Sequence, residues 1–430
     1  MLRRIGTTGL LVIALTACGG GGGTAGAEPT GGKAAPPART TSAVPSAAPT
    51  PAQSEVQRVL ARLTTEEKVG QLFMPVLYGT TAGSASGENQ ARYSARTPAK
   101  VIAKYHLGGV ILFPHNVKST SQVVGLTNGL QRASAKVPLI IGTDQENGLV
   151  SRMSALMTKF PGAGDIGDTK DTDLARQVAK ATGEELRALG VNLDFAPVAD
   201  VNVNPRNPVI GRRAYDDDPR RAAKMVAAAV KGFGEAKIAA TAKHFPGHGD
   251  TSVDSHTGLP IIKHTKAQWE RLDAPPFKAA IDAGVDAVMS AHIVFPKLDP
   301  SGDPATLSKP ILTGLLREKL GFKGVISTDA LNMAGARKKY DDGEVAVRAV
   351  LAGADLLLMP NDLPKAYKAV LAAVKSGRIS EQRLDQSVTR LLTLRHKRGF
   401  LAEAPVASAA KASDVLRSSA HRKLAAKAGD

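Results

Sequence analysis

The densest group of side chains able to do chemistry lies between Lys243 and His256. These fourteen residues hold three histidines, two aspartates and one lysine, and proline and glycine interrupt any regular helix or strand. Loops of this kind are where binding and catalytic groups collect. Three interpretations are open: a metal site with His and Asp ligands, a proton-transfer loop in which Asp254 tunes His256, or a structural loop whose polar groups satisfy one another.

Polar residues also follow most of the short apolar runs of the chain. Six of the eight runs described below are followed by at least one titratable or amide side chain. These residues are Asp144, Asp200, Lys243, His244, His292, Asp329, Asn361 and Asp362. Because the carboxyl ends of parallel strands share one edge, side chains at these positions are expected to converge on a single site.

The elements that must position these residues alternate between short apolar runs and amphipathic stretches. The runs are Val69–Val76, Gly109–Phe113, Leu139–Thr143, Asn192–Pro197, Ile238–Lys243, Ala287–Ala291, Gly324–Thr328 and Asp355–Met359. Helices are expected between them at Asp173–Leu189, Arg220–Ala236, Pro276–Ala283 and Gly343–Ala352. Eight β-then-α repeats predict an α/β fold of the (β/α)8, or TIM-barrel, type, with a doubly wound open sheet as the alternative.

Residues 1–18 are typical of a secretory signal peptide. A cationic start, Met1–Arg4, precedes the apolar run Leu10–Thr16, which is too short to span a hydrocarbon core of ~30 Å. The residues Leu15–Gly19 resemble a bacterial lipobox, and this resemblance implies cleavage before Cys18 and lipidation of its thiol. Cys18 is the only cysteine of the chain, so an internal disulfide is excluded.

Three further segments follow the signal peptide. Residues 19–55 are expected to be a flexible linker, because Gly, Ala, Pro, Ser and Thr bury too little apolar surface to offset their ordering entropy. Residues 56–402 are expected to form the barrel domain, and residues 403–430 a C-terminal extension. The predicted location is the outer face of the cell membrane, with a lipid anchor, or the extracellular medium.

The formal net charge of +17 indicates an affinity for anionic surfaces. Lysine and arginine are spread along helices and aromatic residues make up only 4%, so nucleic acid is not expected as a partner. The membrane surface and an anionic wall polymer are the expected counter-surfaces. The sequence leaves the oligomeric state open, with a monomer as the expectation.

The segment Lys243–His256 resembles the signature of bacterial β-N-acetylglucosaminidases of glycoside hydrolase family 3. Asp144–Glu146, Ile210–Tyr215 and Ser327–Met333 resemble further motifs of that family, in the same order, and the resemblance spans about Val56 to Leu401. It implies a barrel enzyme without cofactor or metal. The implied substrate is a cell-wall saccharide, derived from peptidoglycan, with a terminal N-acetylglucosamine.

The resemblance also implies roles for single residues. Asp329 matches the nucleophile that forms a covalent glycosyl intermediate, His256 the general acid/base, and Asp254 the carboxylate that orients it. The residues that match substrate-binding positions are Asp144, Arg152, Arg213, Lys243, His244 and His292. Two positions depart from the family pattern: Asn147-Gly148-Leu149 replaces two glycines and an arginine, and Ala330 replaces a second acidic residue.

Other functions remain open at this stage. A β-N-acetylglucosaminide phosphorylase and a family 3 β-glucosidase or β-xylosidase are the nearest enzymes, a zinc amidohydrolase using His244 and His248 is a more distant one, and a sugar-binding lipoprotein would not be catalytic. Among individual residues, His248 and Asp250 are expected to brace their loop and Trp269 to serve packing, while Asp200 is a candidate partner of Arg213.

Overall fold

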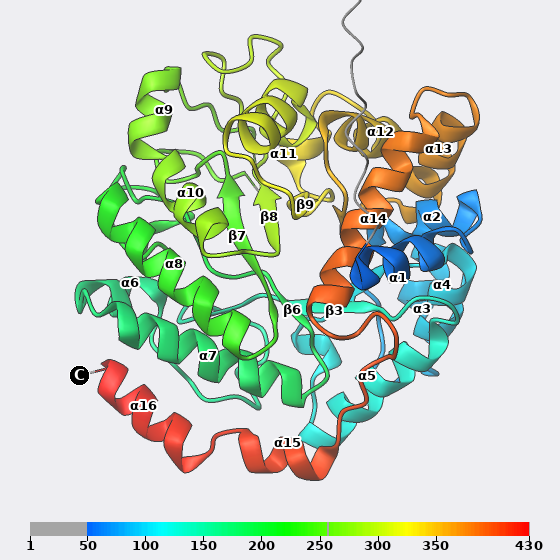
Figure 1. Ribbon diagram of the computed structural model, residues 1–430, viewed down its shortest axis with the longest axis horizontal. Helices are drawn as coiled ribbons and strands as arrows, with labels where there is room; N and C mark the ends of the chain where they lie inside the picture. The colour runs from blue at the N-terminus through cyan, green and yellow to red at the C-terminus, as the bar shows by residue number, and fades with distance from the viewer. Residues whose placement is uncertain (1–49, 256–257, 430) are drawn as a thin grey trace, which may run out of the picture. The chain divides into compact units, whose positions relative to one another are not determined.

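The computed structural model describes residues 50–255 and 258–429, and eight parallel strands lie at its centre (Figure 1). The strands are β1 (Phe73–Met74), β2 (Gly109–Ile111), β3 (Ile140–Thr143), β6 (Leu193–Asp194), β7 (Ala239–Phe245), β8 (Ala287–Ser290), β9 (Val325–Ser327) and β10 (Leu357–Leu358). Six of them pair in the order β2-β3-β6-β7-β8-β9, and β1 pairs with β10. Isolated backbone bridges then join Val76 to Ile111 and Leu356 to Ser327. The ring is therefore closed, which confirms the (β/α)8 barrel.

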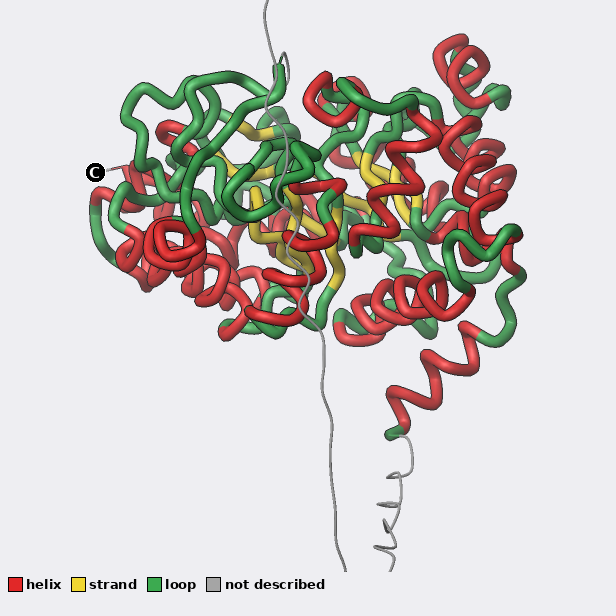
Figure 2. The backbone as a smooth tube through the Cα atoms, turned by 90° about the horizontal axis from the view of Figure 1, so that it is seen from above, coloured by secondary structure: helices red, strands yellow, loops and turns green. Residues whose placement is uncertain are grey.

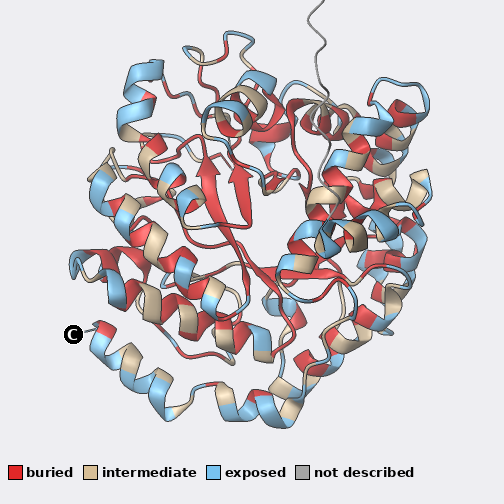
Figure 3. Ribbon diagram, viewed as in Figure 1, coloured by how far each residue is buried: buried red, intermediate tan, exposed pale blue. Residues whose placement is uncertain are grey.

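Seven of the predicted apolar runs contain one of these strands, and the run Ile238–Lys243 covers all but the last two residues of β7. The strands are buried throughout, as Figure 3 shows, because parallel strands in a barrel are covered on both faces. Phe245 of β7 packs edge-to-face on Phe277 and Trp269, with ring centroids 5.2 and 6.1 Å apart respectively. Trp269 is fully buried and its indole nitrogen donates to the Pro246 carbonyl oxygen at 2.9 Å, so its predicted packing role is confirmed.

Helices surround the strands (Figure 2). Those of the described residues are α1 (Pro51–Leu60), α2 (Thr65–Gln71), α3 (Gly87–Tyr93), α4 (Pro98–Tyr105), α5 (Thr120–Ala133), α6 (Ala163–Asp168), α7 (Thr172–Ala188), α8 (Pro219–Glu235), α9 (Lys266–Leu272), α10 (Ala274–Asp282), α11 (Ala334–Arg337), α12 (Asp342–Ala352), α13 (Leu363–Lys375), α14 (Glu381–Lys397), α15 (Ala409–Val415) and α16 (Ser419–Gly429). The 3-10 helices are η1 (Pro114–Asn116), η2 (Gly211–Arg213) and η3 (Ala305–Leu307), and η4 (Pro310–Lys319) is a π-helix of ten residues. A hairpin of β4 (Gln145–Asn147) and β5 (Val150–Ser151) follows β3.

Capping residues set the starts of the crossover helices. Asp171, Asp218 and Asp341 each accept backbone hydrogen bonds at the first turn of α7, α8 and α12. Asp362 does the same for α13, so this polar residue after β10 serves as a helix cap. The four helices predicted between strands agree with α7, α8, α10 and α12 within two residues at each end.

Two sequence boundaries were wrong. The first half of the run Val69–Val76 belongs to α2, because Thr64 and Glu67 form a capping box that begins a helix there; the strand begins only at Phe73. The predicted linker 19–55 extends too far, because α1 begins at Pro51 behind the cap Thr50. Residues 1–49, including the predicted signal peptide and Cys18, lie outside the described residues.

The C-terminal extension is helical in the described residues, and α15 and α16 lie along α5 and α7 (red in Figure 1). Arg417, between the two helices, donates to the carbonyl oxygens of Ser154, Ala155 and Met157 at 3.2, 2.7 and 3.1 Å. The extension therefore fastens the turn that follows Arg152.

A membrane-spanning helix would need a long apolar stretch. None of the helices in the described part of the chain meets that requirement.

Candidate active site

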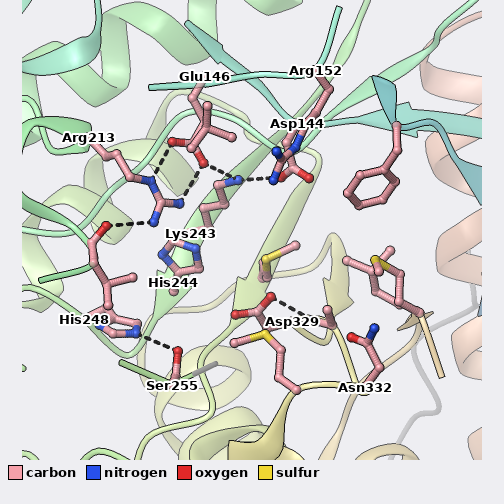
Figure 4. A pocket seen from close by; sticks show the side chains of 18 residues that line it. Asp144, Glu146, Arg152, Arg213, Lys243, His244, His248, Ser255, Asp329 and Asn332 are labelled. Atoms are coloured by element: carbon pink, nitrogen blue, oxygen red, sulfur yellow. Dashed lines mark hydrogen bonds and ion pairs between the residues drawn. The ribbon is translucent and has the colours of Figure 1, made fainter. Parts of the chain in front are cut away.

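A cavity of about 320 Å³ opens at the carboxyl ends of the strands (Figure 4). Its polar lining consists of Asp144, Glu146, Arg152, Arg213, Lys243, His244, His248, Ser255, Asp329 and Asn332. These residues come from the ends of β3, β7 and β9, from the β4–β5 hairpin, from η2 and from the loop after β7. The chemistry therefore collects where the sequence pattern predicted it.

Four charged side chains form a continuous network on one wall of the cavity. Glu146 accepts two hydrogen bonds from Arg213, both 2.8 Å long, and its Oε1 lies 2.7 Å from Lys243 Nζ. Lys243 Nζ donates at 2.7 Å to Asp144 Oδ1. The side chains of Lys243 and Glu146 are only 2% and 4% exposed, so these charges are held in fixed geometry away from bulk water.

The network holds its members in their charged forms. Burial alone would raise the pKa of Glu146, but Lys243 and Arg213 lower it to about 2 through their charges and hydrogen bonds. Burial opposes the charge of Lys243 as well, yet Asp144 and Glu146 outweigh it and raise the pKa of the ammonium. The wall thus presents a permanent pattern of donors and acceptors at neutral pH.

Asp329 enters the cavity from the end of β9. Burial would raise the pKa of its carboxyl, but His292, His244, the Ala330 amide and Lys243 together lower the pKa below its ordinary value. The Ala330 amide donates to Asp329 Oδ1 at 2.7 Å. This carboxylate is therefore ionised and held on a rigid strand end, as a nucleophile must be.

His292 lies behind this carboxylate. Its side chain is fully buried, Nδ1 lies 2.9 Å from Thr306 Oγ1, and Nε2 lies 3.0 Å from the Ala330 carbonyl oxygen. His292 is not among the residues that line the cavity, but its charge acts on the Asp329 carboxylate, and its contact with substrate stays a prediction.

His244 is oriented by Asp200. Its Nδ1 lies 2.8 Å from Asp200 Oδ2, so Nε2 is left for the cavity. Burial would raise the pKa of Asp200, but the His244 ring lowers it. Asp200 was a candidate partner of Arg213; the hydrogen bonds of the Arg213 side chain go instead to Glu146 and to the Val209 carbonyl oxygen.

The loop after β7 is braced by its own side chains. His248 Nδ1 lies 2.9 Å from Thr251 Oγ1, and Nε2 lies 3.1 Å from Ser255 Oγ. Burial and the His244 ring lower the pKa of His248 to about 4, so this histidine is neutral at pH 7. At Gly249 a Cβ atom would stand 1.5 Å from the Val201 carbonyl oxygen, so only glycine allows this close approach.

The end of this loop carries the predicted acid/base. Asp254 is half-buried and Ser255 reaches the cavity lining. His256 lies outside the described residues, so its role and its pairing with Asp254 stay predictions.

Arg152 completes the charged lining. Its guanidinium stacks over the Phe113 ring at 5.3 Å, and its buried Nε has no hydrogen-bond partner among the described residues. A buried donor without a partner is costly in a folded protein. The Arg152 side chain as a whole lines the cavity, as predicted.

Most predicted residues are therefore brought together. The cavity is lined by Asp144, Arg152, Arg213, Lys243, His244 and Asp329. Sequence reasoning gave no role to Glu146, which is the centre of the network. Its signal was the two-residue spacing from Asp144, since alternate residues of a strand face the same side.

A metal site was one early interpretation of the histidine-rich loop. In residues 50–255 and 258–429, no group of three or more His, Cys, Asp or Glu side chains is arranged to hold a metal ion.

A further carboxyl supports the β4–β5 hairpin from below. Asp194 is fully buried, and its Oδ1 accepts from the Gln145 amide at 2.9 Å. Its Oδ2 has no hydrogen-bond partner among the described residues. Burial raises the pKa of Asp194 well above its ordinary value, and Asp144 and Glu146 add to the rise. Burial in the folded protein therefore favours the neutral acid over the carboxylate.

Asp194→Asn should keep the hairpin in place, because a neutral amide oxygen accepts the same hydrogen bond. The folded carboxyl keeps its proton above the unfolded pKa of ~3.9, so its contribution to stability is greatest below pH ~4 and falls as the pH rises. The free energy of unfolding of Asp194→Asn should thus match or exceed that of the wild type at pH 7. Near pH 4 the wild type should gain stability relative to Asp194→Asn. Denaturant melts at both pH values measure this.

Asp194→Ala is the control for the hydrogen bond. It leaves the buried Gln145 amide unsatisfied and should cost about 1–3 kcal/mol at either pH. A loss in Asp194→Asn as large as in Asp194→Ala would show that the charged form matters.

The fold and the cavity together define a (β/α)8-barrel enzyme with a fixed carboxylate opposite a charged binding wall. Residues 64–394 match the family described as "Glycosyl hydrolase family 3 N terminal domain". The chain belongs to glycoside hydrolase family 3, as its motifs predicted.

Individual relatives extend this result. The chain is 39% identical over 396 residues to "Beta-hexosaminidase A" of Pseudoalteromonas piscicida, covering 85% of this chain and 66% of that protein. It is similar to a family 3 β-N-acetylglucosaminidase structure from Paenibacillus sp. str. FPU-7, with a TM-score of 0.79, 44% identity, and 85% and 68% of the two chains covered. The structure of "Beta-glucoside phosphorylase BglX bound to 2FGlc" has a TM-score of 0.79 at 26% identity, with 87% and 67% covered. The chain spans about two thirds of the length of these proteins.

Proposed function

We propose that this protein is a retaining exo-β-N-acetylglucosaminidase that removes a terminal N-acetylglucosamine from cell-wall saccharides derived from peptidoglycan. The observation that carries the proposal is Asp329, an ionised carboxylate at a strand end, in one cavity with the Asp144–Lys243–Glu146–Arg213 network. The similarity to a β-hexosaminidase and to a β-N-acetylglucosaminidase supports the choice of sugar.

The cavity suits one neutral sugar. Three cationic and three carboxylate side chains line it, so its formal charges cancel. Its volume of about 320 Å³ is at the small end of the ~300–1,000 Å³ common for ligand sites, as expected for a single terminal residue. Asp144, Lys243 and Arg152 offer acceptors and donors for hydroxyl and acetamido groups.

The mechanism follows from the two faces of the scissile bond. Asp329 attacks the anomeric carbon, the bond to the leaving oxygen breaks, and a glycosyl ester of Asp329 forms. His256 gives the leaving oxygen its proton, and then accepts a proton from the water that hydrolyses the ester. Asp254 orients the imidazole and stabilises its protonated form. Attack twice at the same carbon retains the anomeric configuration.

The test compares 4-nitrophenyl N-acetyl-β-glucosaminide with the matching β-glucoside. We expect hydrolysis of the former, β-configured product by NMR, and a loss of ~10²-fold in kcat for His256→Ala. Equal rates on the two sugars would remove the substrate assignment. Release of N-acetylglucosamine from a peptidoglycan-derived disaccharide tests the natural substrate class.

A phosphorylase is the second candidate, favoured by the similarity to a β-glucoside phosphorylase. A histidine acid/base repels a phosphate nucleophile less than a carboxylate does. Turnover that requires phosphate and yields a sugar phosphate would replace hydrolysis by phosphorolysis.

We further propose that Cys18 carries a lipid that holds the enzyme at the outer face of the membrane. Cys18→Ala should then move the protein from the membrane fraction to the soluble fraction of the producing cells. Immunoblots of the two fractions measure this, and an unchanged membrane share would contradict the anchor.

A further inference from the structure

A second large cavity, of about 590 Å³, lies at the amino ends of β9 and β10, on the opposite face of the barrel from the catalytic pocket. In Figure 1 the arrowheads of β7 and β8 mark the carboxyl ends of the strands, where the catalytic pocket opens. Phe322, Lys323 and Gly353, which line the second cavity, precede β9 and β10 and so lie at the amino ends. The second cavity is bounded by η4, by the segment before β9 and by the start of α14. Six cationic side chains line it: Lys309, Arg317, Lys323, Arg378, Arg383 and Arg390.

Carboxylates do not balance this charge. Glu318 is the single acidic residue of the lining. Asp355, buried beneath, is shared by three arginines: Arg390 donates to it at 3.0 Å and Arg383 at 3.3 Å, and Arg317 also pairs with it. Including Glu344, which pairs with Arg378 at 2.6 Å, the cavity has six cations against three carboxylates.

The arginines therefore repel one another. Burial, together with the charges of Arg390 and Arg383, lowers the pKa of Arg317 to about 10 against the opposing effect of Asp355. Arg390 makes one side-chain hydrogen bond among the described residues and is 26% exposed, so most of its N–H donors are open to a ligand.

The cationic lining continues beyond this cavity. A neighbouring cavity of about 480 Å³ shares Phe322, Lys323 and Arg390 with it and extends to Lys397. The acidic residue of that second cavity, Asp286, is already paired with Lys397 at 2.9 Å and with Arg398. The two cavities form one basic trough, lined from Lys309 to Lys397, and the volume of each, about 590 and 480 Å³, exceeds that of a single phosphate ion.

We propose that this basic trough binds a linear polyanion with repeating phosphate groups. The guanidinium groups of Arg317, Arg378 and Arg383 are committed to internal carboxylates and carbonyl oxygens, so they fix the positive field of the trough. Lys309, Lys323 and the guanidinium fork of Arg390 are the groups that would contact phosphate oxygens. A phosphodiester keeps its charge over the whole working pH range. Binding of a polymer displaces counterions along the trough and so becomes strongly salt-dependent. Because the trough lies opposite the catalytic pocket, the enzyme stays active while it is held on the polymer.

The test measures binding of long-chain polyphosphate to the full protein. The variant Lys309→Ala/Lys323→Ala/Arg390→Ala should bind ~10-fold or more weakly, and the slope of log K against log salt should fall by about two to three. The matched control Arg96→Ala/Lys118→Ala/Lys224→Ala removes three exposed cations elsewhere and should bind like the wild type. Equal losses in both variants would mean that net charge alone binds, and would overturn the proposal.

Two further arms sharpen the result. Lys309→Ala/Lys323→Ala leaves the arginine cluster intact and should still weaken binding, so a folding defect at Arg390 does not decide the test. Inorganic phosphate, at the same total concentration of phosphate groups, should not displace the polymer. Displacement would show that the trough binds single anions and would contradict the proposal. Saturating polyphosphate should leave hydrolysis of the chromogenic substrate unchanged, and competitive inhibition would place the polymer in the catalytic pocket instead.

Discussion

Asp329→Asn should abolish turnover, with kcat falling by roughly 10⁴–10⁶-fold, as when the nucleophile of a catalytic unit is removed. An amide cannot form the glycosyl ester, whereas the Ala330 hydrogen bond and the size of the side chain are kept. The fold should therefore be kept, and the free energy of unfolding should fall only by the contribution of the charge, because the lowered pKa of Asp329 means that the carboxylate stabilises the folded state at neutral pH. Steady-state rates on the N-acetylglucosaminide, with denaturant melts beside them, measure both quantities.

Asp329→Ala offers a positive control for the same role. It opens space beneath the anomeric carbon, and added azide should restore turnover there by forming a glycosyl azide of inverted configuration. In the wild type, the pKa of Asp329 below its ordinary value places the acid limb of kcat/KM below pH ~4. Retention of more than a few per cent of the activity in Asp329→Asn would assign nucleophilic attack to another group.

Glu146→Ala should be the most destabilising change in the cavity wall. It leaves Lys243 and Arg213 buried without their shared counter-ion, and breaking such a pair costs about 3–5 kcal/mol. Glu146→Gln keeps the shape but not the charge, so it should raise KM more than it lowers kcat, because the ammonium and guanidinium lose their alignment. Denaturant melts and steady-state kinetics on both variants separate these effects.

The pH dependence checks the electrostatic origin of this loss. The folded pKa of Glu146, about 2, lies below the unfolded value of ~4.3, so its stabilisation is present above pH ~4.3 and is lost as the pH falls toward 2. The difference in free energy of unfolding between the wild type and Glu146→Gln should become smaller as the pH falls over that range. Glu88→Ala, which breaks the exposed pair with Arg92, is the control and should cost no more than ~1 kcal/mol. If this difference stayed constant down to pH 2, the loss of stability in Glu146→Gln would come from altered packing and not from the lost charge.

The sequence alone predicted the barrel because its eight apolar runs recur with helical patterns between them. It predicted the convergence of Asp144, Lys243 and Asp329 for the same reason: each follows or ends a parallel strand, and such ends share one edge. The hydrophobic pattern and the position of a residue at a strand end depend on neighbouring residues in the sequence, so a single sequence is enough to predict them.

The remaining features depend on contacts between distant segments. The Glu146–Arg213 pair joins a hairpin to η2 across 67 residues, and no spacing rule predicts which carboxylate that arginine meets. His292 carried the same signal as its neighbours at strand ends, yet its rotamer directs it to Thr306 and Ala330. The helix α1 lay in a segment of linker-like composition, where the Thr50 cap and the buried Val56 outweigh that composition.

The docking of α1 on α14 has a mechanical consequence. Glu55 of α1 lies 2.7 Å from His396 of α14, so this ten-residue helix is held on the outside of the barrel by side-chain contacts. Any force applied to the chain ahead of Thr50 reaches α1 before it reaches a strand. Peeling and stretching these residues would lengthen them from about 15 Å as a helix to roughly 35 Å, a gain of about 20 Å, while the barrel hydrogen bonds stay closed. Under load, α1 would therefore detach and extend before the strands of the barrel separate.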